Sequence, residues 1–196
     1  MVIRVRFPGI SIGNSWPDIV NILGNHKPRL YHHIVQWKFP KEGQLKCNTD
    51  GARKKYPGES AYGLCFRDKH GDLIYAQAKG IGIAINIEAE ARAIQTALSI
   101  SAKKGFQNLV IEMDSLSLMK MILKTWRVPW EIAEILEYII REVQQQQVTI
   151  KHIYREGNQI ADYLANLAID QTEIQDYENF VELPKIVNRI INMDKA

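Results

Sequence analysis

The sequence predicts an α/β domain in which a five-stranded mixed sheet is flanked by helices. Two patterns support this class: alternating apolar and polar residues in the first strands, and apolar residues at helical spacing in later segments. A third observation is a short apolar run between two predicted helices, which suits a strand covered on both faces. In chain order the elements are βββαβααβα. The 196 residues suffice for one such domain with modest extensions.

The first three predicted strands show a period of two. Leu45, Cys47 and Thr49 alternate with polar neighbours, and we expect this strand to end at Asp50. The next two strands form a hairpin around a glycine-containing turn at residues 68–72. They are marked by Leu64 and Phe66 before the turn and by Ile74, Ala76 and Ala78 after it.

The later elements are mostly helical. A helix is expected over residues 87–104, because apolar residues recur there at helical spacing and Gly105 follows as a C-terminal cap. The remaining elements are expected to be a buried strand at 109–111, helices at 116–124 and 129–143, a strand at 148–152, and a last helix capped by Asn158.

The segments outside this pattern are expected to be extensions. Residues 1–36 are predicted to form an irregular arm, residues 37–171 the domain, and residues 172–196 an acidic tail that either docks or stays mobile. The net charge of the three consecutive segments 1–36, 37–169 and 170–196 is +3, +3 and −3. This distribution alone identifies no partner.

Composition favours a soluble intracellular protein. No uncharged stretch approaches the ~20 residues of a membrane span, so no membrane contact is expected. The N-terminus lacks a signal-peptide core. Two cysteines, Cys47 and Cys65, are expected to be buried thiols in a reducing compartment, with nucleus and cytoplasm both left open.

Four acidic residues are candidates for a site. Asp50 and Asp114 each follow an apolar strand, and sites in open α/β sheets collect at the carboxyl ends of strands. Glu90 shares the apolar stripe of its helix with Ile94, where no lysine or arginine stands close by. Asp162 falls in the first turns of the last helix, where the helix dipole favours negative charge.

Each aspartate taken alone also has an ordinary explanation as a turn, cap or dipole residue. The group is harder to explain, because carboxylates gathered at one place repel one another unless divalent cations neutralise them. Oxygen ligands favour Mg²⁺, or Mn²⁺ in its place, over zinc.

The acids stand within four motifs: NTDGA at 48–52, AEA at 89–91, IEMDS at 111–115 and HIYREGNQIAD at 152–162. Together these motifs resemble the ribonuclease H domain, and more narrowly the plant subgroup related to the ribonuclease H domain of non-LTR retrotransposons. The resemblance covers residues 37–171 and implies a ribonuclease H-like fold. Four motifs in the right order are far more specific than any one of them.

The resemblance implies an enzyme that hydrolyses the RNA strand of RNA/DNA hybrids with two metal ions and leaves a 5′ phosphate. Little sequence preference is expected, since family members contact 2′-hydroxyl groups and the backbone. His152 would help to move protons or release product, although a lone histidine on a strand is often a packed or surface residue. The implied metal ligands are Asp50, Glu90, Asp114 and Asp162.

Several other residues are candidates for nucleic-acid contacts. With the four acids neutralised, residues 37–169 carry a net charge of +7, which suits a nucleic-acid binder. A solvated loop is the ordinary alternative for the basic residues near the first acid. The candidates for phosphate contacts are Arg53, Lys54, Lys55 and Arg155, with Asn86 and Ser115 as weaker candidates.

The sequence also departs from the family pattern. The family often has Asn-Pro-Gly after the first strand and threonine before the asparagine that precedes the helix. This chain has Tyr56-Pro57-Gly58 and Ile85 at these places, and it lacks a basic helix after Asp114. Weak substrate affinity is expected.

Two functions therefore remain open. One is a Mg²⁺-dependent endonuclease for RNA/DNA hybrids, and the other is a noncatalytic nucleic-acid-binding remnant of a retroelement. A purely structural domain, whose acids only cap helices, would not explain Glu90 on an apolar stripe.

Overall fold

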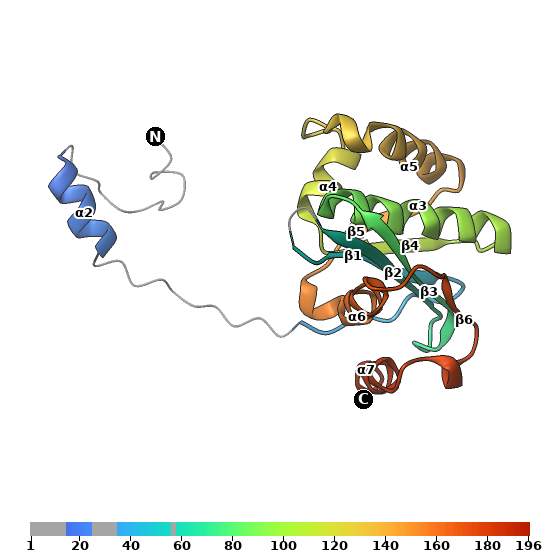
Figure 1. The fold of residues 1–196 in the computed structure, drawn as a ribbon. Coiled ribbons are helices and arrows are strands. Elements are labelled where there is room, and N and C mark those ends of the chain that lie inside the picture. The colour runs from blue at the N-terminus through green and yellow to red at the C-terminus, as the bar shows by residue number, and fades with distance from the viewer. Residues whose placement is uncertain (1–14, 25–34, 56–57) are drawn as a thin grey trace. The chain divides into compact units, whose positions relative to one another are not determined.

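The computed structural model describes residues 15–24, 35–55 and 58–196, and contacts divide the chain into two units, Met1–Ile34 and Val35–Ala196. The first unit contains helix α2 (Trp16–Gly24), so the arm expected to be irregular has a helix in its described part (Figure 1). The hydroxyl of Ser15 accepts a hydrogen bond from the Asp18 amide at 3.3 Å, as expected at a helix N-terminus. Tyr56 and Pro57, where the sequence departs from the family pattern, lie outside the described residues.

The second unit is built on a mixed sheet with strand order β5-β4-β1-β2-β3-β6. β1, β2, β3 and β6 pair antiparallel in succession, whereas β4 pairs parallel with β1 and β5 parallel with β4. The five expected strands are confirmed. Their bounds are β1 (Leu45–Arg53), β2 (Glu59–Arg67), β3 (Leu73–Ile83), β4 (Leu109–Met113) and β5 (Thr149–His152), and the added strand is β6 (Gln175–Tyr177).

The sheet thus has six strands rather than the expected five. β6 has three residues, too few for an alternating pattern, and side-chain contacts hold it against β3. The Asp176 carboxylate accepts hydrogen bonds from the Gln77 amide at 2.8 Å and from the Tyr75 hydroxyl. This strand depends on partners distant in sequence, which local periodicity does not report.

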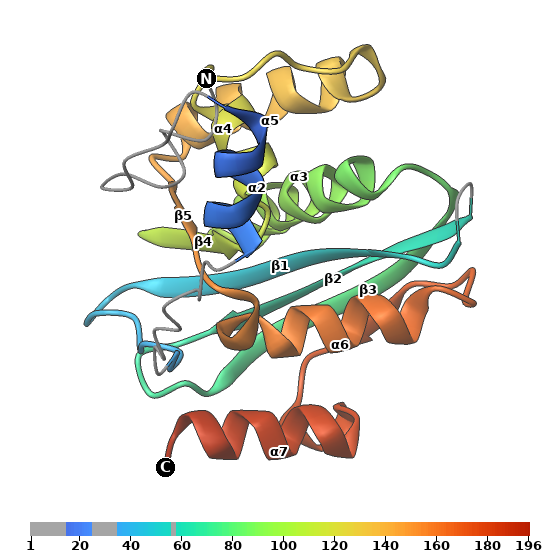
Figure 2. The same ribbon diagram turned by 90° about the vertical axis from the view of Figure 1, so that its left-hand side faces the viewer.

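Helices cover both faces of the sheet (Figures 1 and 2). α3, α4 and α5 lie on one face, and α6 and α7 lie on the other. Gly105, at a φ of 69°, ends α3 as expected. No helix in the described ranges is both long and apolar enough to cross a membrane. The helix bounds are α3 (Asn86–Lys104), α4 (Leu116–Ile122), α5 (Ala133–Gln145), α6 (Gln159–Ala168) and α7 (Lys185–Asp194), with single turns of 3-10 helix at Trp130–Ile132, Arg155–Gly157 and Phe180–Glu182.

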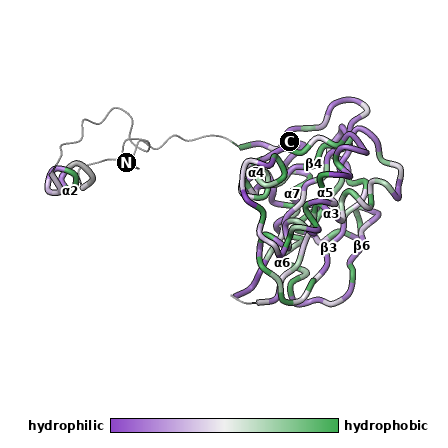
Figure 3. The backbone as a smooth tube through the Cα atoms, turned by 90° about the horizontal axis from the view of Figure 1, so that it is seen from above, coloured by the Kyte–Doolittle hydropathy of each residue, from purple (hydrophilic) through white to green (hydrophobic). Residues whose placement is uncertain are grey.

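Each face of the sheet has its own hydrophobic core. Hydrophobic and hydrophilic residues alternate along the helices, as suits elements with one buried face (Figure 3). Phe66 and Leu98 belong to the core under α3, and Leu164 belongs to the core under α6. Val187 and Ile191 of α7 are fully buried in that second core, so the acidic tail docks. Cys47 and Cys65 are buried free thiols, as expected.

Two glycines let α3 and α6 approach the sheet closely beside Asp50. A Cβ atom on Gly51 would lie 2.3 Å from the backbone nitrogen of Glu90 in α3. A Cβ atom on Gly63, which pairs with Asp50 across the strands, would lie 2.5 Å from the carbonyl oxygen of Ala161 in α6. The absence of both side chains therefore places two helices against opposite faces of β1 and β2 at one point.

Candidate active site

The four predicted acids come together around one cavity of about 200 Å³. Asp50 lies on β1, and Asp114 directly follows β4, which runs parallel to β1. Glu90 lies near the start of α3 and Asp162 near the start of α6. The other residues that line the cavity are Gly51, Ala52, Arg53, Asn86, Arg155 and Asn166.

The register of the sheet places the two strand acids side by side. Asn48 of β1 pairs with Glu112 of β4, so the residues two positions further along reach the same level of the sheet. These residues are Asp50 and Asp114. The expectation that two parallel strands carry acids to one edge is therefore confirmed by the backbone pairing.

Burial and neighbouring negative charge raise the pKa values of two of the acids. For Asp50, burial is the larger cause and the charges of Asp114, Asp162 and Glu90 come after it, and together they raise its pKa to about 8. Burial likewise raises the pKa of Glu90 to about 7, with a smaller contribution from Asp114, while the Ser115 hydroxyl lowers it. Both acids therefore hold protons at pH values where exposed carboxyl groups have lost them.

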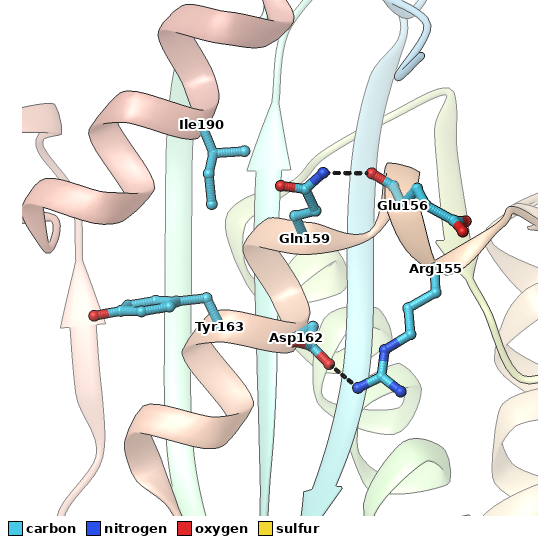
Figure 4. Close-up of a pocket in the computed structure, with 6 residues that line it drawn as sticks. All are labelled: Arg155, Glu156, Gln159, Asp162, Tyr163 and Ile190. Carbon is cyan, nitrogen blue, oxygen red and sulfur yellow. Dashed lines mark hydrogen bonds and ion pairs between the residues drawn. The ribbon is translucent and has the colours of Figure 1, made fainter. Parts of the chain in front are cut away.

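Neighbouring polar groups contact two of the acids. The Asn86 side-chain amide donates to Oε1 of Glu90 at 2.7 Å. The other oxygen, Oε2, is buried and has no hydrogen-bond partner among the residues that the structure describes. The Arg155 guanidinium donates to Oδ1 of Asp162 at 2.6 Å and thereby neutralises that acid (Figure 4).

The donor set suits a hard divalent cation, because it consists of carboxylate oxygens and one of them is buried without a partner. As placed, however, no three acidic, histidine or cysteine side chains of the described ranges form a group that could hold a metal ion. The contacts of Asp162 with Arg155 and of Glu90 with Asn86 are consistent with this open arrangement. The residues therefore fit Mg²⁺ or Mn²⁺ in chemistry, and their positions would have to close around it.

His152 lies at the end of β5, beside the cavity rather than in it. It is exposed, and its Nε2 atom is 3.1 Å from the carbonyl oxygen of Asp114. Its ring contacts Tyr154 edge to face, with centroids 6.1 Å apart. Ser115 caps α4 by accepting from the Leu118 amide at 3.4 Å. It therefore has a structural role in addition to its effect on Glu90.

The basic candidates are divided between the cavity and the surface. Arg53 and Arg155 line the cavity. Lys54 instead forms an exposed ion pair with Asp170 at 2.7 Å, and Lys55 is exposed at a φ of 73°. The loop after the first acid thus brings one of its three basic side chains to the site.

One cavity residue, Asn166, was not predicted. Its side-chain amide donates to the backbone carbonyl of Asp162 at 2.8 Å, one helical turn earlier in α6. The i, i+4 spacing from Asp162 is the sequence signal that could have identified it. A second hollow of about 410 Å³ adjoins the site and is bordered by Arg155, Asp162, Tyr163 of α6 and Ile190 of α7 (Figure 4).

Comparison with known proteins supports the resemblance. The sequence model of the family described as reverse transcriptase-like matches residues 48–168. A protein of Arabidopsis thaliana named for ribonuclease H is 27% identical over 175 residues, which are 88% of this chain and 28% of that protein. Ribonuclease HI of Halobacterium salinarum is 29% identical over 130 residues, which are 65% of each chain. This chain thus spans less than two-thirds of the length of both relatives.

Solved structures are similar over the same region. RNase H1 from Halobacterium salinarum NRC-1 is 27% identical with a TM-score of 0.57, covering 66% of this chain and 99% of that one. LC11-RNase H1, isolated from compost by a metagenomic approach, was solved in complex with an RNA/DNA hybrid. That structure is 25% identical with a TM-score of 0.60, covering 65% of this chain and 98% of that one. The expected fold class is thereby confirmed.

Proposed function

Since the chain belongs to the reverse transcriptase-like family, we propose that residues 37–171 hydrolyse the RNA strand of RNA/DNA hybrids. The observation that carries the proposal is the convergence of four carboxylates from four separate elements on one cavity. The hybrid bound to LC11-RNase H1, a structural neighbour, supports the choice of substrate. The products would be RNA ends that carry a 5′ phosphate.

The proposed ligands for two Mg²⁺ ions, or Mn²⁺ in their place, are Asp50, Glu90, Asp114 and Asp162. When bound, the ions would supply a hydroxide near neutral pH and stabilise the leaving 3′ oxygen. The raised pKa values of Asp50 and Glu90 support this assignment, because burial and, after it, neighbouring carboxylates disfavour the charged forms, which a bound cation would stabilise.

The surrounding side chains would bind and orient the substrate. Arg53 and Arg155 line the cavity and would contact phosphates, and Asn86 lies beside them. Only Nη2 of the Arg155 guanidinium is engaged by Asp162, so its other N–H groups would donate to a phosphate. His152, placed at the rim, would accept or donate a proton as the product leaves. We assign weaker substrate contacts to Lys54, Lys55 and Ser115.

Cleavage of a labelled RNA/DNA hybrid in the presence of Mg²⁺ tests the proposal. We expect Asp50→Asn to lose at least about 100-fold in rate, because even residues outside the ligand shell account for 10–100-fold at metal sites. The matched control is Asp170→Asn, which alters an exposed acid outside the cavity and should cleave at the parent rate. Equal activity of the parent and Asp50→Asn would remove the catalytic assignment.

A noncatalytic binding module is the second candidate. It is favoured by the open arrangement of the carboxylates, since the described acidic side chains do not form a ready metal group. Hybrid binding by the parent without cleavage, at any Mg²⁺ or Mn²⁺ concentration, would support this candidate over the first.

A further inference from the structure

A second layer of polar side chains lies next to the carboxylates, on β1, on β4 and at the start of α6. Side chains two apart on a strand and four apart on a helix share a face. Each member of this layer precedes an acid of the site by two residues on a strand or by four residues at a helix. The polar layer comprises Asn48, Glu112 and Asn158, which precede Asp50, Asp114 and Asp162 respectively.

Asn48, at the centre of the polar layer, uses every hydrogen-bonding position of its side chain. Its amide nitrogen donates to Oε2 of Glu112 and to Oδ1 of Asn158, both at 3.3 Å. Its carbonyl oxygen accepts from Nε1 of Trp37 at 3.0 Å and from the guanidinium of Arg67 at 3.2 Å. A side-chain amide offers two donors and two lone pairs, so no alternative orientation satisfies these partners equally well.

Asn158 joins β1 to α6 at the positions that flank two acids. Its side-chain amide donates at 3.0 Å to the carbonyl oxygen of Thr49, the residue before Asp50. The backbone carbonyl oxygen of Asn158 accepts a hydrogen bond from the backbone amide of Asp162 at 3.1 Å. The residue is fully buried and stands at the N-cap position of α6, as expected, but its side chain does not make the helix-capping hydrogen bond. Its contacts instead fix the start of α6 against the strand that carries Asp50.

The charges around the polar layer are paired. Glu112 forms an ion pair with Lys46 at 2.8 Å, and only 7% of each side chain is exposed. Arg67 stacks on the ring of Trp37 at 3.4 Å and forms an ion pair with Asp194 of α7 at 2.6 Å. The buried side-chain atoms of the polar layer itself are all partnered, whereas Nε of Arg67 is buried without a hydrogen-bond partner in the part of the chain that the structure describes. Partnered buried polar groups favour one arrangement, because a displacement leaves a group unpaired. The side chains of the polar layer are therefore held in one arrangement, whereas the carboxylate layer contains a buried oxygen, Oε2 of Glu90, that has no partner within the described ranges.

We propose that Asn48 and Asn158 are positioning residues, which hold Asp50 and Asp162 at a fixed separation against the mutual repulsion of the acids. The side-chain amide of Asn158 donates to the peptide carbonyl beside Asp50. Asn48 acts one step further out, because its own amide donates to Asn158 and to Glu112 and so holds Asn158 against β1 and β4. The inference rests on the proposed function for its activity and metal-binding readouts, but not for its unfolding readout. Metal binding and unfolding test it without substrate.

The first test measures Mn²⁺ binding without nucleic acid. Asn158→Ala should weaken Mn²⁺ binding by about 10-fold or more, as loss of outer contacts does at metal sites. Asn158→Asp keeps the shape of the side chain but loses the donor to the Thr49 carbonyl, so it should weaken Mn²⁺ binding similarly. This variant replaces Asn158→Ala in the test if the alanine variant does not fold. With hybrid, the rate constant kcat should fall while KM changes little.

The matched control is Gln77→Ala. Gln77 is also buried and makes three side-chain hydrogen bonds, with Tyr62, Tyr75 and Asp176, outside the polar layer. A merely structural role predicts that variants of Asn158 and Gln77 lower the urea midpoint alike and leave Mn²⁺ affinity unchanged. That result would overturn the proposal.

A second test needs no metal. At pH 8.5 in EDTA, Asp50→Asn should raise the urea midpoint of the parent by relieving repulsion among the acids. The rise should be smaller in the Asn158→Ala background, where the acids can move apart, and additive effects would refute positioning.

If the parent binds Mn²⁺ but cleaves no hybrid, the proposed function fails and Mn²⁺ affinity still decides the role of Asn158. If the parent binds no Mn²⁺, this double-mutant cycle decides it.

Discussion

Asp50→Asn should stabilise the metal-free protein, and the gain should grow as the pH rises. The folded state raises the pKa of Asp50 from 3.8 to about 8, first through burial and then through the three neighbouring acids. One step in pKa corresponds to ~1.4 kcal/mol, so ionising Asp50 in the folded state costs at most about 6 kcal/mol. Because the neighbouring acids share this repulsion with Asp50, we expect a gain of about 2–4 kcal/mol.

The pH range follows from the two pKa values. Below pH 4 the carboxyl group is protonated in both the folded and the unfolded state, so asparagine brings little gain. Between pH 4 and pH 8 the unfolded state has lost the proton and the folded state retains it, so the parent loses stability with rising pH. Above pH 8 the full gain of the variant should be present.

Urea unfolding in EDTA at pH 5, 6.5 and 8.5 measures this difference. Asp170→Asn is the control, since its carboxylate is exposed and its free energy of unfolding should differ from that of the parent by less than about 1 kcal/mol at every pH. A gain for Asp50→Asn that is equal at pH 5 and pH 8.5 would show that its carboxylate is not destabilised by burial and neighbouring charge.

Three further outcomes are expected. Mg²⁺ should raise the melting temperature of the parent but not of Asp50→Asn, and calorimetry showing equal shifts would argue against these ligands. Gly51→Ala should destabilise by about 1–3 kcal/mol and slow hybrid cleavage at least tenfold, because the added methyl group would displace α3; an unchanged rate would contradict the close approach. Asp194→Ala should destabilise by about 3 kcal/mol in urea unfolding, because it leaves Arg67 buried and unpaired, whereas Asp170→Ala should have little effect.

The elements predicted best are those in which the spacing of apolar residues along the chain shows which side chains are buried. The alternation in β1 and the stripe on α3 reflect which side chains contact a core, so both elements could be located from spacing alone. The same logic identified Glu90, because an acid on an apolar stripe faces the protein interior, and Glu90 is half-buried in the fold. The convergence of the four acids on one cavity follows from these placements and the parallel pairing of β1 with β4.

What the sequence could not predict depends on partners far along the chain. Asn158 occupies a capping position, yet its side chain bonds to Thr49, which is 109 residues earlier. β6 is too short to show a period, and the docking of α7 depends on the core into which Val187 packs. Local spacing reports that a residue is buried and does not report what it contacts.

The close approach of α3 and α6 at Gly51 and Gly63 has a consequence for how damage to this domain would be detected. The helices over the two hydrophobic cores approach opposite faces of the sheet at glycines that neighbour Asp50 in sequence and in strand pairing. If the domain cleaves hybrids as proposed, a void in either core should let its helix shift against the sheet and slow cleavage before the chain unfolds. We therefore expect the cleavage rate to respond to packing defects in this domain more sensitively than the melting temperature.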